Sequence, residues 1–159
     1  MRYTDLTLAE SENFMEAYFK QFPGVKEFLD DLRIQAAEQG YVETLLGRRR
    51  YFPNLKTQSN RNIRNREERE AINAPVQGTA ADIMKLAMLR VPDAIEQAGL
   101  QGKMLLQVHD ELVLEVPRGE LAPTQKIVSD VMENVFPLRV PLVTEARHGS
   151  NWGEMEVLA

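Results

Sequence analysis

Hydrophobic residues recur every three or four positions in the first quarter of the chain, and this spacing predicts two helices. Thr7 and Glu10 have the spacing of a capping box, so we expect the first helix to follow Thr7 and to reach about residue 21. Pro23 suits the first turn of a second helix, which Gly40 would end. We expect the apolar faces of both helices to be core, with inward side chains from Leu8, Phe14, Met15, Tyr18, Phe19, Phe22, Val25, Phe28, Leu29, Leu32 and Ala36.

A longer helical pattern covers residues 63–97. Its polar positions are spaced three, four and four apart, so they share one face of the helix: Arg66, Arg69, Asn73 and Gln77. The opposite face is approximated by Ile72, Ala74, Val76 and Ala80. Pro75 has no amide hydrogen and would clash with the carbonyl of Ala71, so we expect a kink or a restart there, with Thr79 and Asp82 as a second capping box. One bent helix that continues through Pro75 is the alternative.

Short runs rich in β-branched and aromatic residues predict the strands of the first half of the chain. Residues 41–45 and 48–52 would pair as a hairpin around Leu46 and Gly47, and a polar loop would cover residues 54–62. The three arginines Arg48, Arg49 and Arg50 therefore lie on a strand, with alternate side chains on opposite faces.

The last third of the chain predicts a hairpin, a helix and a final strand. The hairpin covers residues 103–116 with its bend at residues 108–111. The helix follows Pro117 and stops before Pro137, the final strand covers residues 140–147, and a tail covers residues 149–159. This order predicts an antiparallel sheet that helices cover on one face, so the expected fold class is α+β.

The bend of the second hairpin carries the strongest candidate chemistry. Its polar residues are His109, Asp110 and Glu111, although a tight hairpin turn usually contains Asn or Gly because its central residues need positive φ. A turn that breaks the local rule is a place to expect function. Two adjacent carboxylates suit a divalent cation such as Mg²⁺, which takes oxygen ligands and usually only one or two protein carboxylates. A charged hairpin tip without a function is the alternative.

Composition narrows the classes of protein. The chain has 43% hydrophobic and 27% charged residues, as is typical of a globular protein, and it has two histidines. It has no cysteine, which excludes disulfides, thiolate catalysis and cysteine-based zinc sites. With no apolar run long enough for a membrane span and no signal segment, we expect a cytoplasmic protein. The net charge is −5, yet residues 48–66 carry seven basic and no acidic side chains. This basic island is a candidate phosphate-binding stripe, and a solvated loop is the alternative.

Three sequence blocks, in this order, resemble the C-terminal part of the bacterial DNA polymerase I family, the family A DNA polymerases. They are GYVETLLGRRRYFP at residues 40–53, EREAINAPVQGTAAD at residues 68–82 and QVHDE at residues 107–111. The similarity runs over nearly the whole chain and ends in Asn151-Trp152. The resemblance implies that residues 1–64 belong to the fingers subdomain and residues 65–159 to the palm, in a bacterial or phage-type enzyme.

The resemblance also assigns roles. It implies that Asp110 is one of two palm aspartates that hold the catalytic Mg²⁺ ions, with Glu111 beside it and His109 near the primer terminus. It implies that Arg69, Asn73 and Gln77 face the template–primer, where donors can test base-pair geometry in the minor groove without reading sequence. Arg66 lies on the same face. The basic residues Arg48, Arg49 and Arg50 would meet DNA phosphates.

Family members also have an upstream palm aspartate in a strand and a fingers helix that grips the incoming dNTP, and neither is found in this sequence. We therefore expect a DNA-directed DNA polymerase by family whose 159 residues are inactive alone and need a missing N-terminal polymerase portion as partner. The alternative is a non-catalytic DNA-binding or assembly half of a split polymerase, which exposed apolar surface on the first two helices would favour. A small metal-dependent nuclease that uses Asp110 and Glu111 is a third, weaker hypothesis.

Overall fold

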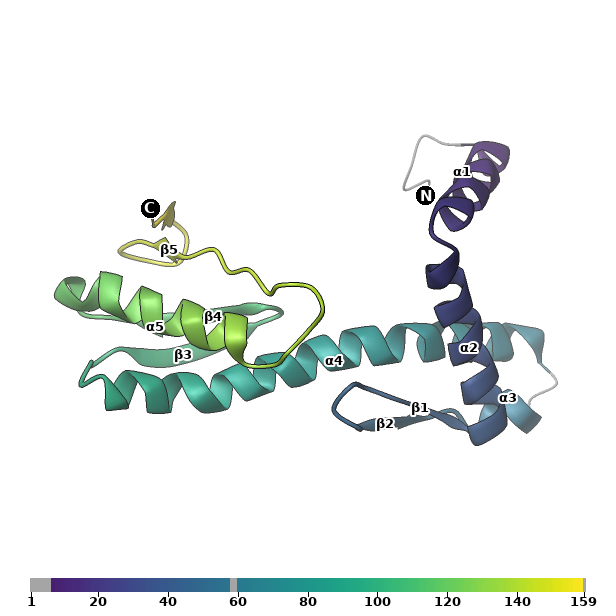
Figure 1. Cartoon of the computed structure of the whole chain (residues 1–159), viewed down its shortest axis with the longest axis horizontal. Helices are drawn as coiled ribbons and strands as arrows, with labels where there is room; N and C mark the ends of the chain where they lie inside the picture. Colours follow the sequence, from purple (N-terminus) through teal and green to yellow (C-terminus); the bar gives the residue numbers. More distant parts are fainter. Residues whose placement is uncertain (1–6, 58–59, 159) are drawn as a thin grey trace. The chain divides into compact units, whose positions relative to one another are not determined.

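The computed structural model describes residues 7–57 and 60–158, which form an α+β protein. The chain divides into two compact units, Met1–Gly78 and Thr79–Ala159, and the division falls within the long helix α4 (Arg61–Gln97) (Figure 1). The expected α+β class is confirmed. The assignment of residues 1–64 to fingers and residues 65–159 to palm stays a prediction.

The first unit begins with the two helices that the sequence predicts, α1 (Leu8–Gln21) and α2 (Pro23–Gln39). Both halves of the capping box at the start of α1 are formed: the Glu10 amide donates to Thr7 Oγ1 at 3.3 Å, and the Thr7 amide donates to the Glu10 carboxylate at 2.7 Å. At the end of α2, Gly40 takes the left-handed conformation with φ 80°, which a residue without Cβ adopts at little cost. Both predicted helices and their caps are confirmed.

The prediction that the apolar faces of these two helices are core is wrong for most of their length. Phe14 is 67% exposed and Phe28 is 46% exposed, and Leu8, Met15, Tyr18, Phe22 and Val25 are exposed as well. Only Leu32 and Ala36, near the end of α2, are buried among the described residues of the two helices. Periodicity identifies an apolar face, but it does not say whether a partner covers that face.

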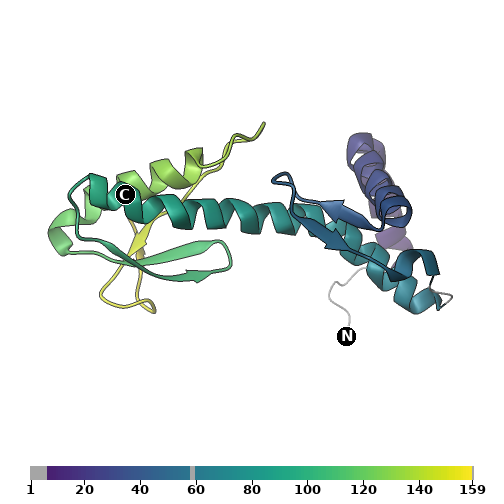
Figure 2. The ribbon, with the colours of Figure 1, turned by 90° about the horizontal axis from the view of Figure 1, so that it is seen from below.

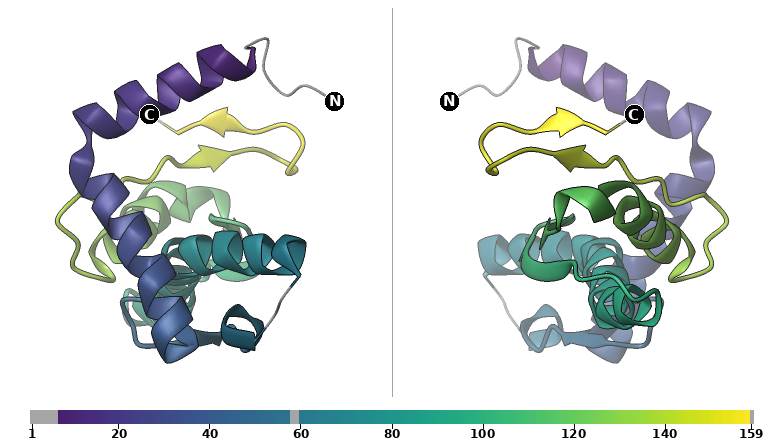
Figure 3. Two further views of the ribbon diagram at one scale, coloured as in Figure 1. Left: turned by 90° about the vertical axis from the view of Figure 1, so that its right-hand side faces the viewer. Right: turned by 90° about the vertical axis from the view of Figure 1, so that its left-hand side faces the viewer.

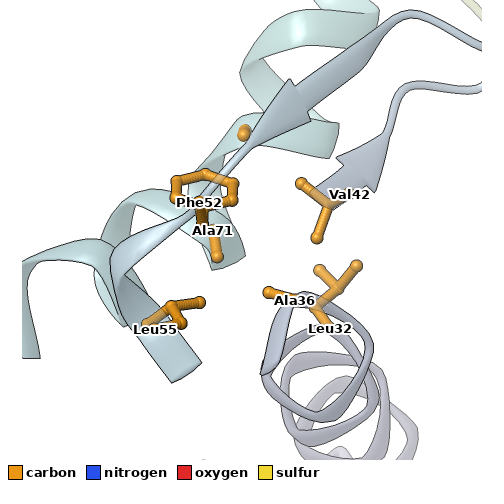
Figure 4. Close-up of a cluster of buried hydrophobic side chains, with 7 residues drawn as sticks. Leu32, Ala36, Val42, Phe52, Leu55 and Ala71 are labelled. Carbon is orange, nitrogen blue, oxygen red and sulfur yellow. The ribbon is translucent and has the colours of Figure 1, made fainter. Parts of the chain in front are cut away.

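A hairpin follows, formed by β1 (Tyr41–Glu43) and β2 (Arg49–Tyr51), which pair antiparallel with Val42 opposite Arg50. It packs on the end of α2 and on α4, and a cluster of buried side chains fills the space between these elements (Figure 4). The cluster consists of Leu32, Ala36, Val42, Phe52, Leu55, Ala71 and Ala74. The predicted first hairpin is confirmed, and it lies over the core of this unit. Its strands are shorter than expected, and the prediction that Arg48 lies on a strand is wrong, since Arg48 precedes β2.

The expected loop over residues 54–62 is partly wrong. Residues Asn54–Thr57 form a short helix, α3, and α4 already begins at Arg61. The physical reason is Leu55, an apolar residue in a polar stretch, whose side chain is buried in the cluster and holds the segment against the core. Residues 58 and 59 lie outside the described residues.

Helix α4 continues through Pro75, so the expected restart with a second capping box is wrong and the continuous helix is observed. Ala74, Pro75, Thr79 and Asp82 are buried, whereas Val76 and Ala80, expected to lie on the apolar face, are exposed. Proline costs about 3 kcal/mol in a helix interior. Burial of this stretch by tertiary packing offsets that cost.

The second unit contains the second predicted hairpin, formed by β3 (Lys103–Val108) and β4 (Glu111–Glu115) (Figure 2). A β-bulge between Met104 and Leu106 interrupts the ladder. A short 3₁₀ turn, η1 (Arg118–Glu120), leads into α5 (Leu121–Asn134). The guanidinium of Arg90 on α4 donates to the carbonyl of Val135 at 3.0 Å and joins the end of α5 to α4. Buried side chains of this unit include Ala87, Val91, Ile95, Thr124 and Val135.

The predicted strand over residues 140–147 is wrong. Within the described residues, only Arg147–His148 (β5) is a strand there, and it pairs with Glu156–Val157 (β6) in the expected tail (Figure 3). Pro141 cannot donate to a ladder. The Glu133 carboxylate on α5 instead accepts from the Thr144 amide at 2.9 Å and from the Thr144 hydroxyl at 2.8 Å. The described strands therefore form three separate two-stranded ladders.

Candidate functional site

The bend of the β3–β4 hairpin is a two-residue turn. Val108 pairs with Glu111, which leaves His109 and Asp110 to connect the strands as the sequence predicts. His109 has φ 52°, and it is the only residue other than glycine with positive φ in the described ranges. The side-chain amide of Gln107 donates to the carbonyl of His109 at 2.5 Å. This hydrogen bond holds the residue just before Asp110 in its left-handed conformation.

His109, Asp110 and Glu111 are all exposed to solvent. Asp110 lies in the turn and Glu111 is the first residue of β4, so two carboxylates stand next to each other where a ligand can reach them. Their oxygens match the donor preference of Mg²⁺, which commonly takes one or two carboxylates and completes its shell with water and phosphate oxygens. In the part of the chain that the structure describes, no three His, Cys, Asp or Glu residues gather into one cluster. The residues present fit a partial magnesium site made of one carboxylate pair.

The polar face of α4 is a second candidate surface. The sequence places Arg66, Arg69, Asn73 and Gln77 along it, and all four side chains are exposed in the structure. The Arg69 guanidinium donates back to the carbonyl of Asn65 at 3.2 Å. Beside it lies a groove of about 330 Å³, lined by Arg33, Asn65, Glu68, Arg69 and Ile72. The predicted common face is confirmed, while its contact with DNA stays a prediction.

Two arginines that are distant in sequence meet at one carboxylate. Arg50 on β2 and Arg66 on α4 contact the two oxygens of Glu70 at 2.7 and 2.9 Å. The hydrogen bond from Arg66 holds the pKa of the Glu70 carboxyl below its ordinary value, and the charge of Arg50 acts in the same direction. Arg66 and Glu70 are four residues apart on a helix, a spacing visible in the sequence. The bond from Arg50 depends on the fold, and the sequence analysis missed Glu70 as the residue that organises this cluster.

The other two arginines of the hairpin have different surroundings. Arg49 pairs with Glu43 across the hairpin at 2.6 Å, and its guanidinium lies over the ring of Tyr41, 4.4 Å from the centroid. Arg48 donates to the carbonyl of Gly78 in α4 at 3.0 Å. The three arginines thus form no uniform row, since each is held by a different part of the first unit.

Comparison with known proteins shows to which family this chain belongs. The model for DNA polymerase family A matches residues 1–154. The chain belongs to DNA polymerase family A. The three blocks that carry the resemblance to family A fold as the β1–β2 hairpin, the middle of α4 and the turn of the β3–β4 hairpin.

Family A relatives and a solved structure agree with this assignment. The chain is 47% identical over 145 residues to DNA polymerase I of Streptococcus pneumoniae, and 45% identical over 148 residues to DNA polymerase I of Geobacillus stearothermophilus. These alignments cover 91% and 93% of the chain but 16% and 17% of the relatives, so the chain spans about a sixth of their length. A structure of the polymerase domain of Pol1 from M. smegmatis, in complex with DNA primer-template and dNTP, matches with TM-score 0.81 and 50% identity. That match covers 86% of this chain and 24% of the other.

Proposed function

We propose that this chain forms part of the active site of a template-directed DNA polymerase, which transfers a nucleotide from dNTP to a primer 3′-hydroxyl with the help of Mg²⁺. The observation that carries the proposal is the position of Asp110, beside Glu111 at an exposed hairpin turn, in a chain of family A. The related M. smegmatis structure, a complex with primer-template and dNTP, supports DNA and dNTP as partners.

The residues at the end of the β3–β4 hairpin have two tasks in this proposal. Asp110 and Glu111 would hold magnesium through their carboxylate oxygens. The chemistry that magnesium would supply there is activation of the primer hydroxyl and stabilisation of the charge on the leaving pyrophosphate. His109 lies next to the primer terminus, and the hydrogen bond from Gln107 to the carbonyl of His109 keeps the turn in one conformation. A fixed turn reduces the reorganisation that precedes the reaction.

The first unit provides the DNA-binding surface in this proposal. Arg69, Asn73 and Gln77 face the minor groove, whose acceptors lie at similar places in every base pair, so the contacts do not depend on sequence. Arg49, Arg50 and Arg66 contact backbone phosphates, which gives salt-dependent binding. Ion pairs between exposed side chains contribute only about 0–1 kcal/mol. The pairs of these arginines with Glu43 and Glu70 can therefore exchange for pairs with phosphate.

We also propose that these 159 residues alone do not synthesise DNA. Two metal ions need more ligands than the pair Asp110 and Glu111, and the resemblance to family A assigns a second aspartate and the dNTP-binding helix to another polymerase segment. The polymerase that contains this chain is expected to act in the bacterial cytoplasm. The relatives named above are bacterial, which supports this expectation. Separately, no helix within residues 7–57 and 60–158 is long and apolar enough to cross a membrane.

Primer extension tests the proposed function. We expect no magnesium-dependent extension by the chain alone, and extension by a hybrid in which the chain replaces the matching segment of the S. pneumoniae DNA polymerase I. Extension by the chain alone would overturn the proposed dependence on another segment. A hybrid that is folded by thermal unfolding, but neither binds nor extends a primed template, would contradict the proposed function.

The exposed apolar face of α1 and α2 favours a second candidate, a non-catalytic half that binds DNA and assembles with another part of a polymerase. Exposed large apolar side chains on one face are typical of a surface that a partner covers. A folded hybrid that binds primed template as tightly as the parent polymerase, yet makes no product, would support this candidate over the catalytic one.

Charge reversal at the hairpin tests the DNA-binding surface. We expect the double substitution Arg49→Glu and Arg50→Glu to lower the affinity of the chain for primed duplex DNA by at least about 100-fold, because two phosphate contacts become repulsive. Fluorescence anisotropy with labelled DNA measures the affinity. Lys20→Glu in α1 is the matched control, since it reverses an exposed charge outside the proposed surface. Unchanged binding by the double variant would remove Arg49 and Arg50 from the proposed surface.

A further inference from the structure

The turn of the β1–β2 hairpin lies close to α4 at Gly78. A Cβ atom placed on Gly78 would lie 2.6 Å from Cγ2 of Thr44 and 3.1 Å from Nη2 of Arg48. Two carbon atoms that are not linked through bonds do not approach to 2.6 Å, so one of them would have to shift. Glycine at this position therefore allows a contact between hairpin and helix that no other residue allows.

Because the hairpin lies close to α4 here, the Arg48 side chain reaches the backbone of the helix and forms a hydrogen bond with it. Its guanidinium donates to the carbonyl of Gly78 at 3.0 Å. A carbonyl oxygen has two lone pairs, so it can accept this bond in addition to the helical one. The donor is charged, and hydrogen bonds of this kind are stronger than those between neutral groups. Arg48 thus ties the turn of the hairpin to the middle of α4.

Thr44 holds Arg48 in the position that this bond requires. The amide of Arg48 donates to the Thr44 hydroxyl oxygen at 3.1 Å, and the amide of Thr44 donates to the Arg48 carbonyl at 3.0 Å. Thr44 is only 8% exposed, so its side chain is fixed against the helix. Thr44 therefore carries the atom nearest to the Cβ position of Gly78, and it also fixes the backbone of the arginine that bonds to Gly78.

The stretch of α4 next to this contact is weak as an isolated helix. Pro75 cannot donate to the carbonyl of Ala71, and glycine is a poor helix former. Asn73 and Gln77, two exposed residues of the polar face, lie within this stretch. Because this stretch of α4 is weak, the directions of these two side chains depend on contacts that other elements make with the helix. The hydrogen bond from Arg48 to the Gly78 carbonyl is such a contact, and Gly78 is the residue next to Gln77.

We propose that Arg48 is a positioning residue: it acts through the carbonyl of Gly78 to fix the part of α4 that carries Asn73 and Gln77, and it does not contact a DNA phosphate. This separates Arg48 from Arg49 and Arg50 within the basic hairpin. The inference rests on the proposed function insofar as Asn73 and Gln77 face DNA, but the coupling between hairpin and helix can be measured without DNA.

Amide hydrogen exchange of the free chain tests the coupling. We expect Arg48→Ala to accelerate exchange of the α4 amides around residues 77–82 by about fivefold to tenfold, the loss expected for one hydrogen bond with a charged donor. Gly78→Ala should have a similar effect without removing any charge. Adding Thr44→Ser should reverse the effect of Gly78→Ala, because serine lacks the methyl group at 2.6 Å and keeps the hydroxyl that accepts from Arg48. Lys20→Ala is the control.

DNA binding at several salt concentrations separates positioning from phosphate contact. Loss of a phosphate contact reduces the slope of log affinity against log salt by about 0.9. We expect Arg49→Ala to show this change, and Arg48→Ala to lower affinity about fivefold with the slope unchanged. The double variant Thr44→Ser with Gly78→Ala should recover the wild-type affinity.

Two results would overturn the inference: a slope for Arg48→Ala that falls as it does for Arg49→Ala, or wild-type exchange rates in both Arg48→Ala and Gly78→Ala. If the wild-type chain does not bind DNA, the proposed DNA-binding surface fails, and the exchange rates still decide whether Arg48 fixes α4. Circular dichroism at the assay temperature shows whether each variant is folded.

Discussion

Asp110→Asn is expected to reduce nucleotide incorporation by the hybrid polymerase at least about a thousandfold, because metal ions contribute several kcal/mol of charge stabilisation and each 1.36 kcal/mol is a factor of ten. Asparagine has nearly the same shape as aspartate and fits the same turn, but it lacks the negative charge that would hold Mg²⁺ at the proposed site. Single-nucleotide incorporation under single-turnover conditions measures the effect on the chemical step.

Asp93→Asn provides the matched control, since it makes the same change at an exposed position of α4 in the same unit. Incorporation by this control should stay within about twofold of the parent hybrid, as for most surface substitutions. DNA affinity should be nearly unchanged in the Asp110→Asn variant, because the proposed phosphate contacts lie elsewhere. If Asp110→Asn retained a tenth or more of the parent rate, Asp110 would not be a metal ligand.

Phe52→Ala is expected to destabilise the first unit by about 3–5 kcal/mol, the usual cost of removing a buried aromatic side chain. Phe52 is 3% exposed and lies in the cluster between α2, the β1–β2 hairpin and α4, where Val42, Leu55 and Ala71 surround it (Figure 4). Its loss leaves a cavity that these neighbours cannot fill. Urea denaturation, followed by the far-ultraviolet circular dichroism signal, measures the change in the free energy of unfolding.

The same substitution in α1, Phe14→Ala, serves as the control. Phe14 is 67% exposed, so we expect its removal to change the free energy of unfolding by less than about 1 kcal/mol. Equal destabilisation by the two substitutions would show that α1 is covered in solution by a part of the chain that lies elsewhere in the structure. The ratio of the two effects is therefore a measure of where the core of the first unit lies.

Local signals in the sequence predicted most of the secondary structure. The capping box at Thr7, the glycine stop at Gly40 and the short apolar runs on both sides of His109 each depend on a few neighbouring residues, and each is found as predicted. The same holds for the common face of Arg66, Arg69, Asn73 and Gln77, which follows from helical spacing alone.

Features that depend on distant residues could not be predicted in this way. The bond from Arg50 to Glu70 and the contact of Thr44 with Gly78 join positions at least 20 residues apart, and no local pattern encodes them. The strand expected over residues 140–147 failed for a local reason, because Pro141 interrupts it. The expected burial of the apolar face of α1 failed for a third reason. A pattern of apolar residues describes one surface, whereas burial also requires a second surface that packs against it.

The bulge in the β3–β4 hairpin bears on how much length variation this hairpin can accept. Leu105 has no partner in the ladder, yet Met104 still faces Leu114 and Leu106 faces Val113. One surplus residue is thus taken up at Leu105, with Leu106, Gln107 and Val108 between it and the turn. Because side chains alternate between faces, an insertion or deletion between the bulge and the turn would turn the following side chains to the opposite face. The placement of the two carboxylates therefore depends on the number of residues that separate them from Leu105, as well as on their identity.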